Sequence, residues 1–245
     1  MSKNINYSLI IPCFNEQDNL LELSVKIHEL LLKRANMEVI FVDNGSTDNS
    51  SNLFKSIKNT NLRIYVQTIK INIGYGNGLL EGMKIAQGSV IVWTHADLQC
   101  NPEDVERAIK EWEASSPICD SLLVKGRRTG RGIIATSISL GMSFVNLLVN
   151  RIWIFDVNGQ PNLMKIEAIS VVPDLPLDAT FELHLFSFLR KCSEYRFRYI
   201  EVEFPDRVNG IGANERIINK LQYVMKTIRR VFIIRGKIEN YQAQN

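Results

Sequence analysis

The stretch Val90-Ile-Val-Trp-Thr-His-Ala-Asp-Leu-Gln99 decides the fold of this chain. It begins with four apolar residues, which predict a short strand buried on both faces. The strand ends in a polar turn, and the Asn-Pro pair at 101–102 then has the character of a helix N-cap and a first helical residue. The turn carries a carboxylate and an amide, Asp97 and Gln99. Because ligands of open α/β sheets bind beyond the carboxyl ends of the strands, this turn predicts a binding site.

Strand-type and helix-type segments alternate on both sides of this stretch. Apolar runs predict strands at residues 7–12, 38–43, 62–68, 89–94, 121–125 and 198–204. Helical periodicity and helix-start signals predict helices after Asp48 and at residues 20–32, 74–87, 102–115, 133–150, 181–189 and 215–234. This alternation with short connections predicts an α/β fold with a doubly wound, mostly parallel sheet.

Composition sets the broad class of the protein. With 245 residues, 45% of them hydrophobic and 22% charged, the chain suits one globular α/β domain or one domain with an elaborated end. A net charge of +3 is too small to indicate nucleic acid as a partner. The four cysteines form no CxxC pair, and no charged-then-apolar signal sequence precedes the first predicted strand. We therefore expect reduced thiols and a cytoplasmic protein.

Two segments suggest contact with a membrane surface. Residues 133–150 carry no charge but include several Ser, Thr and Asn residues, which favours a buried or interfacial amphipathic helix over a membrane-spanning one. A basic turn at 125–131 precedes this segment, and the predicted helix at 215–234 is also basic and amphipathic. Such segments suit a membrane face that displays anionic lipid, so we expect peripheral contact. A solvated basic turn and a C-terminal helix packed on the core are the alternatives.

Three predicted loops leave the carboxyl ends of the first, second and fourth strands. They carry Asn15 with Glu16, the Asp43-Asn44-Gly45 segment, and the turn with Asp97 and Gln99. Because these loops converge in one crevice, their acids repel one another unless a cation lies among them. A nucleoside diphosphate with a divalent ion meets this need: Asp43 can accept hydrogen bonds from a base, and Asp97 and Gln99 can offer oxygen ligands to Mg²⁺ or Mn²⁺. The alternative is that both aspartates are only turn formers.

The segment Gly74-Tyr-Gly-Asn-Gly78 opens a predicted helix without matching a known phosphate-binding pattern. It does not fit GxGxxG, because Leu79 stands where the third glycine is required, and no GxxxxGK[ST] pattern occurs in the chain. A dehydrogenase and a P-loop ATPase are therefore not indicated. The glycines instead predict a helix that closely approaches the sheet or a ligand.

Five segments together resemble the motif series of the family 2 glycosyltransferases. They are Ile10-Ile-Pro-Cys-Phe-Asn-Glu16, Val42-Asp-Asn-Gly-Ser-Thr-Asp48, Asn72-Ile-Gly-Tyr-Gly76, Ala96-Asp-Leu-Gln99 and Gly126-Arg-Arg128. The likeness is specific, because the motifs occur in order and the match runs from about Tyr7 to Gly212. Within the family, the chain is similar to dolichyl-phosphate mannosyltransferases and bacterial polyprenyl-phosphate glycosyltransferases.

The resemblance implies a GT-A fold, a UDP- or GDP-sugar donor, a divalent metal and inversion at the anomeric carbon. It implies a GT-A domain over residues 1–212, with a nucleotide-binding half (1–100) and an acceptor half (101–212), before a basic helix at 213–245. The donor nucleotide would contact Pro12, Asn15, Glu16, Asp43, Asn44, Gly45, Gly74, Gly78, Ala96 and Asp97. The metal would be bound by Asp97 and Gln99, with His95 as a candidate third ligand, and the acceptor phosphate by Arg127, Arg128, Arg131 and Arg207.

Three positions depart from the family pattern. The usual Asp-Ala-Asp turn begins here with His95, which removes one negative charge, so we expect weaker metal affinity. This imidazole can ligate Mn²⁺ or hydrogen-bond the loop. Asn44 replaces the second acid of the Asp-Asp-Gly-Ser motif, and the late loop at 207–210 lacks the Ser-Lys pair that commonly follows. A GT-A-like protein that binds a nucleotide sugar without performing chemistry is therefore an alternative.

The acceptor decides whether a base is needed. A lipid phosphate is already ionised, so Arg127, Arg128 and Arg131 would only have to orient it. A sugar hydroxyl requires a carboxylate base, and Asp178 and Glu182 are the candidates, since residues four apart share a helix face. The primary hypothesis is an inverting hexosyltransferase that acts on a polyprenyl-phosphate or lipid-linked acceptor in cell-surface glycan synthesis, and transfer to a glycan hydroxyl is the runner-up. The predicted catalytic residues are Asp97, Asp178 and Glu182.

Overall fold

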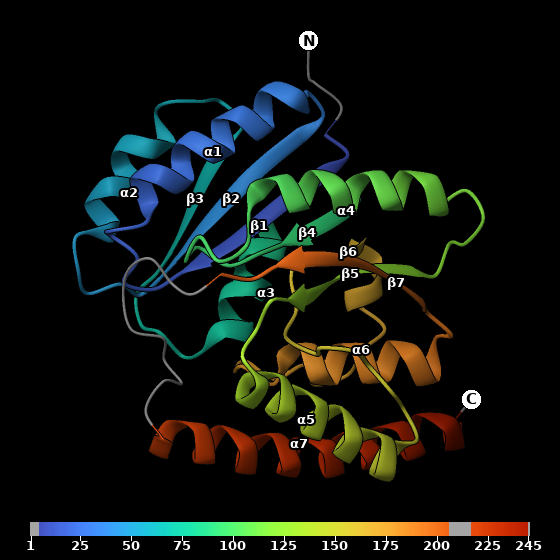
Figure 1. Ribbon diagram of the computed structural model, residues 1–245. Coiled ribbons are helices and arrows are strands. Elements are labelled where there is room, and N and C mark those ends of the chain that lie inside the picture. The colour runs from blue at the N-terminus through green and yellow to red at the C-terminus, as the bar shows by residue number, and fades with distance from the viewer. Residues whose placement is uncertain (1–4, 206–216, 245) are drawn as a thin grey trace.

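The computed structural model of the chain describes residues 5–205 and 217–244 (Figure 1). Its centre is a seven-stranded sheet in the order β3-β2-β1-β4-β6-β5-β7. The strands are β1 (Tyr7–Cys13), β2 (Met37–Asn44), β3 (Ile64–Ile69), β4 (Val90–Trp93), β5 (Leu122–Thr129), β6 (Asn162–Lys165) and β7 (Arg196–Glu203). Neighbouring strands pair in parallel, except that β6 runs antiparallel to both β4 and β5. The predicted α/β fold with a mostly parallel sheet is confirmed.

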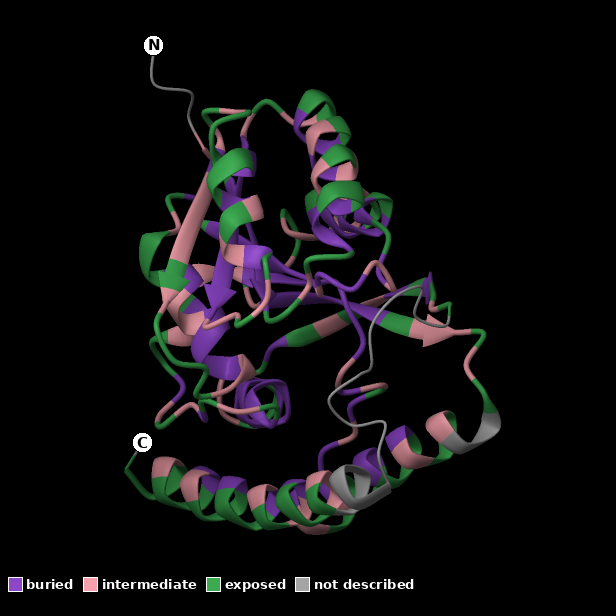
Figure 2. Cartoon of the chain, turned by 90° about the vertical axis from the view of Figure 1, so that its left-hand side faces the viewer, coloured by how far each residue is buried: buried purple, intermediate pink, exposed green. Residues whose placement is uncertain are grey.

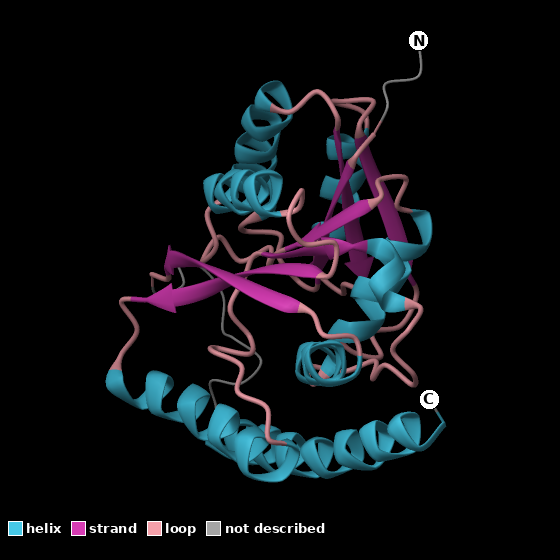
Figure 3. Cartoon of the chain, turned by 90° about the vertical axis from the view of Figure 1, so that its right-hand side faces the viewer, coloured by secondary structure: helices cyan, strands magenta, loops and turns pink. Residues whose placement is uncertain are grey.

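Helices cover both faces of this sheet. They are α1 (Leu20–Lys33), α2 (Ser50–Lys58), α3 (Tyr75–Ile85), α4 (Pro102–Ser115), α5 (Ile133–Asn150), α6 (Phe181–Cys192) and α7 (Ile217–Gln244), with a 3-10 helix at Ile166–Ile169. The first, second and fourth helices lie on one face, and α3 and α6 lie on the other (Figures 1 and 3). Helices α5 and α7 form a further layer outside α6.

Successive side chains of the central strands enter two separate cores. Leu9 and Ile11 of β1 pack in the core shared with α1 and α4, whereas Ile10 packs in the core shared with α3 and α6. Because strand side chains alternate between faces, a strand covered on both faces must be apolar throughout. This explains why all four residues of β4 are buried and why its apolar run was a reliable signal.

Strand β6 was not predicted. Its four residues include Asn162 and Lys165, so the segment shows neither the apolar run nor the alternation that marks a strand. Its place in the sheet comes from pairing with β4 and β5, which are distant in the sequence. The strand predicted at 121–125 extends to Thr129, and β7 begins two residues before the predicted start.

Four polar residues of the uncharged segment lie on the buried face of α5, namely Ser139, Ser143, Asn146 and Asn150. Ser143 Oγ donates to the Ile154 carbonyl (2.6 Å), and Asn146 Nδ2 donates to the Ile152 carbonyl (3.1 Å). These groups are satisfied by the protein's own backbone, as expected for a helix packed on the fold. In the described part of the chain, no helix combines the length and the apolar character needed to cross a membrane.

The C-terminal helix α7 is longer than predicted and packs on the fold. It buries Val231, Ile234 and Ile238 in the core that contains α6, and Asn150 Nδ2 of α5 donates to the Val231 carbonyl (3.2 Å). The first two residues predicted for this helix, 215 and 216, lie outside the described residues. Figure 2 shows that the outward side of the α5–α7 layer is largely exposed, while the central strands of the sheet are buried. The division of the chain at residue 212 stays a prediction.

Candidate functional site

The loops after β1 and β2 are joined by hydrogen bonds. Asn15 N donates to Ser46 Oγ (3.1 Å), and Thr47 N donates to Asn15 Oδ1 (2.8 Å). Glu16 N donates to Ser50 Oγ (3.0 Å). Asn15 has φ +56°, a left-handed conformation that asparagine adopts more readily than most residues. The structure thus brings the first two predicted site loops together at the carboxyl ends of adjacent strands.

Asp43, at the end of β2, is buried and accepts two hydrogen bonds, one from the loop after β2 and one from the start of α2. Ser46 N donates to Oδ1 (3.0 Å), and Ser51 Oγ donates to Oδ2 (2.5 Å). These are the contacts of a turn-forming aspartate. Each carboxylate oxygen can accept a further hydrogen bond, so contact with a nucleotide base stays a prediction.

Asn44 and Gly45 fasten the same loop to the start of α3. Asn44 Nδ2 donates to the Gly74 carbonyl (3.0 Å), whereas its buried Oδ1 has no hydrogen-bond partner among the described residues. Gly45 has φ +75°, and a Cβ there would lie 2.6 Å from the backbone nitrogen of Asn72. The loop therefore requires glycine at this position for both conformation and space.

The glycine-rich start of α3 approaches the sheet closely, as predicted. A Cβ on Gly78 would lie 3.2 Å from Pro12 Cβ and 3.3 Å from Asn44 Nδ2. A Cβ on Gly74, which has φ +134°, would collide with the Leu177 carbonyl. Gly78 therefore lies beside the predicted donor loops, whereas Gly74 is covered by the backbone of another segment. Contact of either glycine with the donor stays a prediction.

The turn after β4 buries Asp97 and links Gln99 to the end of β7. Asp97 Oδ1 accepts a hydrogen bond from Gln99 N (3.2 Å), and Leu98 between them has φ +60°. Gln99 Nε2 donates to the Pro205 carbonyl (2.9 Å), so the amide oxygen is its atom for ligation. Ala96 is buried beside them and leaves no room for a larger side chain against the core. The turn presents one carboxylate and one amide, as the sequence predicted.

His95 stands on this turn next to an aromatic ring. Its ring centroid lies 5.5 Å from that of Tyr75, the first residue of α3. Tyr75 Oη accepts a hydrogen bond from Gln160 Nε2 (2.5 Å), and burial, together with the charge of Glu182, raises the pKa of Tyr75 well above its usual value. Across the described residues, no three His, Cys, Asp or Glu side chains gather as a metal site. Metal ligation by His95 stays a prediction.

Glu182 is buried beneath this turn and accepts hydrogen bonds from three side chains. Its Oε1 is the acceptor for Trp93 Nε1 (2.8 Å), Asn162 Nδ2 (3.0 Å) and Gln160 Nε2 (3.1 Å). The donors come from β4, from β6 and from the residues just before β6. This carboxylate therefore fixes α6 against β4 and against β6 with the residues just before it.

The prediction that Asp178 and Glu182 share one face of a helix was wrong. Helix α6 begins at Phe181, so Asp178 precedes it and the spacing of a helix does not apply. Asp178 Oδ1 accepts from Thr180 N (2.7 Å), and its Oδ2 pairs with Lys226 Nζ of α7 (2.9 Å). Burial raises the pKa of Asp178, but the contacts with Thr180 and Lys226 outweigh burial and lower it overall. The two carboxylates therefore face different elements, and their catalytic roles stay predictions.

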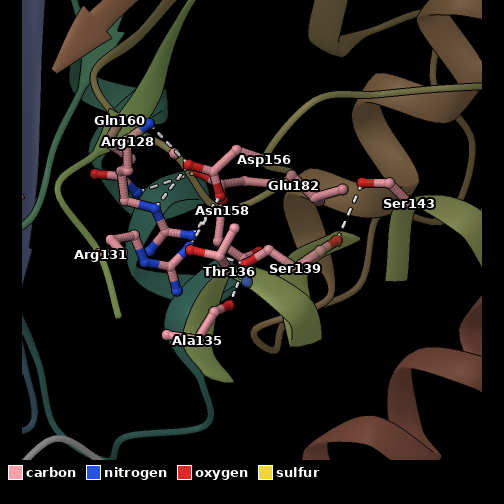
Figure 4. Close-up of polar contacts among 12 residues, drawn as sticks. Arg128, Arg131, Ala135, Thr136, Ser139, Ser143, Asp156, Asn158, Gln160 and Glu182 are labelled. Atoms are coloured by element: carbon pink, nitrogen blue, oxygen red, sulfur yellow. Dashed lines mark hydrogen bonds and ion pairs between the residues drawn. The ribbon is translucent and has the colours of Figure 1, made fainter. Parts of the chain in front are cut away.

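Two arginines converge on one carboxylate after β5 (Figure 4). Arg128 Nε donates to Asp156 Oδ2 (2.8 Å), and its Nη2 donates to Oδ1 (2.5 Å). Arg131 Nη1 lies 3.6 Å from Asp156 Oδ1 and donates to Ser139 Oγ (2.9 Å). Burial and the nearby charge of Arg128 lower the pKa of Arg131. Because two guanidinium groups share one carboxylate, this arginine cluster keeps a net positive charge in a half-buried position.

Arg128 is held more firmly than the sequence predicted. Two of its nitrogens bind Asp156, and its guanidinium lies 4.9 Å from the centroid of the Phe204 ring. The next residue, Pro205, accepts the hydrogen bond from Gln99. Arg128 and Gln99 therefore contact two consecutive residues, Phe204 and Pro205, which brings the arginine cluster near the turn after β4.

The expectation that Arg127 joins its neighbours was wrong. Successive strand residues point to opposite faces, and the Arg127 guanidinium lies 5.7 Å from the centroid of the exposed Phe155 ring. Arg131 was also predicted to bind the acceptor phosphate. Its guanidinium lies farther from Asp156 than that of Arg128 does. Arg207 lies outside the described residues.

A buried lysine shapes the loop that carries Asp156. Lys125 Nζ donates to the carbonyls of Val157 (2.8 Å) and Gly159 (2.7 Å) and to Asn162 Oδ1 (3.2 Å). Burial lowers the pKa of Lys125 to about 8. Its three donors are all used within the protein, so its role is to hold the loop.

Sequence reasoning missed this lysine, Asp156 and Gln160. One signal was available: no Asp or Glu occurs between Asp120 and Asp156, so Asp156 is the first acid after the basic turn. A basic turn that becomes buried needs such a partner. No comparable signal marks Gln160, because its partners lie in α3 and α6.

Comparison with known proteins identifies the family. Residues 8–170, more than half of the chain, match the family described as Glycosyl transferase family 2. The chain belongs to this family. All five motif segments quoted above lie within the matched residues. The resemblance read from the sequence is thus confirmed.

Curated relatives in the family are longer than this chain. It is 32% identical over 114 residues to the uncharacterized glycosyltransferase YkcC of Bacillus subtilis (strain 168), a match that covers 46% of this chain and 35% of that protein. It is 26% identical over 209 residues to the uncharacterized glycosyltransferase sll0501 of Synechocystis, covering 84% and 63% respectively. A third relative, the undecaprenyl-phosphate 4-deoxy-4-formamido-L-arabinose transferase of Pseudomonas fluorescens (strain Pf0-1), is 31% identical over 124 residues, covering 49% and 36%. The chain therefore spans less than two thirds of each of these relatives.

Solved structures show the same fold. A glucosyl-3-phosphoglycerate synthase from Mycobacterium tuberculosis, in complex with phosphoglyceric acid, superposes with a TM-score of 0.71 at 16% identity, covering 94% of this chain and 80% of that one. Another structure of that synthase, with Mn²⁺, UDP and glucosyl-3-phosphoglycerate, gives a TM-score of 0.69 at 16% identity with the same coverage. At this identity the likeness concerns the fold, and it confirms the GT-A architecture.

Proposed function

We propose that this family 2 member is an inverting glycosyltransferase that moves a hexose from a UDP- or GDP-sugar to a polyprenyl phosphate or a related lipid-linked phosphate. The observation that carries the proposal is the arginine cluster beside the turn after β4. Arg128 and Arg131 share the single carboxylate of Asp156, so a half-buried positive charge remains. An acceptor phosphate offers the oxygens that would satisfy it, and arginine suits phosphate through paired N–H groups.

The relatives support this acceptor class. Three proteins with 30–33% identity over part of the chain are named undecaprenyl-phosphate 4-deoxy-4-formamido-L-arabinose transferases. Their matched segments cover only about a third of each protein. They therefore guide the choice of acceptor class, while the sugar they are named for is not carried over.

The alternative acceptor, a glycan hydroxyl, has less support from the geometry. Transfer to a hydroxyl needs a carboxylate that can take its proton. Asp178 pairs with Lys226, and this contact helps to lower its pKa, so it is a weak base. Glu182 Oε1 already accepts three hydrogen bonds from buried donors. An acceptor phosphate needs no base, because it is ionised before it binds.

The donor is expected in the crevice formed by the loops after β1, β2 and β4. Asn15, Glu16 and Asp43 would contact the nucleoside, and Asp97 and Gln99 would hold a Mg²⁺ or Mn²⁺ ion with the diphosphate. One carboxylate and one amide oxygen suit a cation that takes most of its ligands from phosphates and water. When bound, such an ion stabilises the charge on the leaving diphosphate. With His95 in place of an acid, we expect this ion to be held weakly.

We further propose that the acceptor is met at the inner face of a membrane, to which the protein binds peripherally, during cell-surface glycan synthesis. The support is the lipid nature of the proposed acceptor and the basic turn that adjoins α5. A second possibility is a GT-A protein that binds a nucleotide sugar without transfer, which the replacement at His95 motivates.

The test compares two acceptors that differ only in the phosphate. The purified chain is incubated with a panel of UDP- and GDP-hexoses, Mg²⁺ or Mn²⁺, and either undecaprenyl phosphate or undecaprenol. We expect a glycolipid of inverted anomeric configuration from undecaprenyl phosphate alone. Product from undecaprenol or a glycan, abolished by Glu182→Gln in a variant that melts normally, would instead establish the hydroxyl route. Calorimetric binding of UDP or GDP without product from any acceptor would indicate the silent alternative.

A further inference from the structure

Helix α5 exposes apolar side chains on the side away from the fold. Leu140, Phe144, Leu147 and Leu148 lie on this side at helical spacing, and Phe144 and Leu148 are 52% and 66% exposed. Several polar side chains of the same helix, such as Ser143, are buried against the fold instead. Large apolar side chains on the outward side depart from the usual arrangement in a surface helix of a globular protein.

Helix α7 continues this apolar surface. Met225, Phe232 and Ile233 are exposed, on the side opposite the buried Val231 and Ile234. The two helices pack together as the outermost layer of the molecule, so their outward sides belong to one surface (Figures 1, 2 and 3). We call these exposed apolar residues of α5 and α7 the outer face. An apolar surface of this extent marks an interaction site.

Positive charge accompanies the outer face. No Asp or Glu occurs in α5, and the first acid of α7 is Glu239, near its end. Arg151 and Arg229 are exposed and form no ion pair with another described residue. Lys226, by contrast, pairs inward with Asp178. Within α5, and within α7 up to Glu239, apolar side chains and arginines therefore occur together without an acid in the same helix.

The charge and the apolar character of the outer face indicate which partner binds it, a second copy of the chain or a lipid surface. A second copy of the chain would bring Arg151 and Arg229 of one molecule near those of the other, and like charges across an interface oppose association. An anionic bilayer supplies an apolar boundary for the leucines and phenylalanines and headgroup phosphates for the arginines. We propose that the outer face docks the molecule on an anionic lipid surface, with α5 and α7 lying in the interface.

The docking also has a consequence for the site. Ser139, near the start of α5, accepts the hydrogen bond from Arg131, so the arginine cluster lies at one end of the docked layer. A lipid phosphate in the same membrane would reach the cluster without leaving its leaflet. This consequence rests on the proposed function, whereas the docking itself does not.

The test uses the full chain and sedimentation with vesicles of phosphatidylcholine, alone or mixed with phosphatidylglycerol. The wild-type chain is expected to bind the mixed vesicles and to release as salt is raised. Phe144→Asp combined with Phe232→Asp should weaken this binding by about tenfold or more, because both charges oppose burial in the interface. The matched control combines Leu32→Asp and Leu62→Asp, at side chains 85% and 95% exposed on other parts of the surface. The control should bind as the wild type does.

A second pair of variants tests the charge. Arg229→Glu should weaken binding to mixed vesicles by about tenfold or more, whereas Lys58→Glu on the exposed side of α2 should change it little. Equal binding by all variants, or equal binding to pure phosphatidylcholine, would overturn the proposal. A lipid-free dimer that the Phe144 and Phe232 changes abolish would assign the outer face to a second copy instead.

Calorimetry with UDP and GDP separates this proposal from the proposed function. A docking variant that loses the vesicles but still binds nucleotide supports docking by the outer face. Wild-type binding to mixed vesicles without any glycosyl transfer would leave the docking supported and the proposed function wrong.

Discussion

The half of the molecule that ends at residue 100 and the half that follows hold their polar groups in different ways. In the first half, Asp43 is held by a backbone N–H of its own loop and by the Ser51 hydroxyl at the start of α2. In the second half, the Arg128 side chain is held by two hydrogen bonds to Asp156, and the Lys125 side chain is fully buried. When a charged side chain with neutral hydrogen-bond partners is replaced, no charge is left without a partner. When one member of a buried ion pair is replaced, the other charge stays buried and uncompensated. Charge removal should therefore affect chemistry in the first half and folding in the second.

The two halves also differ in how far their contacts reach along the chain. Asp43 and its donor Ser46 are three residues apart, whereas Trp93 and Glu182 are 89 residues apart. Local contacts form as soon as a strand and its turn form. The network around Glu182 requires that the sheet and α6 are assembled, so the acceptor side of the site depends on the whole fold.

The largest expected effect is the loss of activity in Asp97→Asn. This change keeps the size of the side chain and removes the single carboxylate expected to hold the cation at the diphosphate. We expect glycosyl transfer to fall by about a thousandfold, because metal stabilisation of the leaving group is worth several kcal/mol. The melting temperature should change little. The matched control is Asp18→Asn, an exposed acid of the loop after β1, which should retain activity. Full activity of Asp97→Asn with saturating donor and metal would contradict the assignment.

The next largest effect is a loss of stability in Asp156→Ala. The change leaves Arg128 and Arg131 close together without a shared carboxylate, at side chains only 10% and 16% exposed. We expect unfolding to become easier by about 3 kcal/mol, as for other buried pairs that lose one partner. Denaturant titration measures this. Asp120→Ala, which removes a 92% exposed partner of Lys165, is the control and should cost about 0.5 kcal/mol or less. Equal costs in the two variants would remove the contrast between the halves.

The same contrast explains which parts the sequence predicted. Strands β1, β2 and β4 were found because burial on both faces demands apolar runs. The loop after β1 carries Asn15, and the turn after β4 carries Asp97. The presence of α5 and α7 also followed from their patterns, including the choice of a buried or interfacial helix over a membrane-spanning one for α5. The family resemblance came from segments within this regular half and the start of the next.

What could not be predicted depends on partners far away in the chain. β6 exists because β4 and β5 pair with it, and nothing in its four residues indicates that. Arg127 and Arg128 are adjacent in the sequence, yet the strand turns them to opposite faces, and only Arg128 meets Asp156. Asp178 and Glu182 were expected to share a helix face because they are four residues apart, but α6 begins at Phe181, where it was predicted, so Asp178 precedes the helix.

A smaller effect is expected from His184 in the second half. This side chain is fully buried on α6, and burial, with the charges of Arg230 and Lys237, lowers its pKa to about 4. The unfolded chain takes up the proton near pH 6.5, before the folded one does. Stability should therefore be complete above pH 6.5 and fall by up to about 3 kcal/mol as the pH drops toward 4.

Replacing His184 by leucine tests this pH dependence. Denaturant titrations at pH 7.5 and pH 5 should show a smaller loss between the two values in His184→Leu than in the wild type, since leucine takes up no proton. An unchanged loss would mean that other groups cause the acid sensitivity. The comparison also tests whether the second half is the acid-sensitive one, because the charges that act on His184 come from Arg230 and Lys237 of α7 and from Asp174.

The smallest expected effect compares two helical glycines. A Cβ on Gly82 of α3 would lie 2.5 Å from Ile10 Cγ2 and 3.0 Å from Val42 Cγ2, both fixed in the sheet. A Cβ on Gly236 of α7 would meet nothing within 4 Å. Alanine favours a helix over glycine by about 1 kcal/mol, but overpacking costs about 1–3 kcal/mol. Gly82→Ala should therefore lower the free energy of unfolding by about 1 kcal/mol, whereas Gly236→Ala should raise it by about 0.5–1 kcal/mol. Stabilisation by both changes would show that α3 can move away from the sheet, and the close packing of the first half would then not be what fixes its loops.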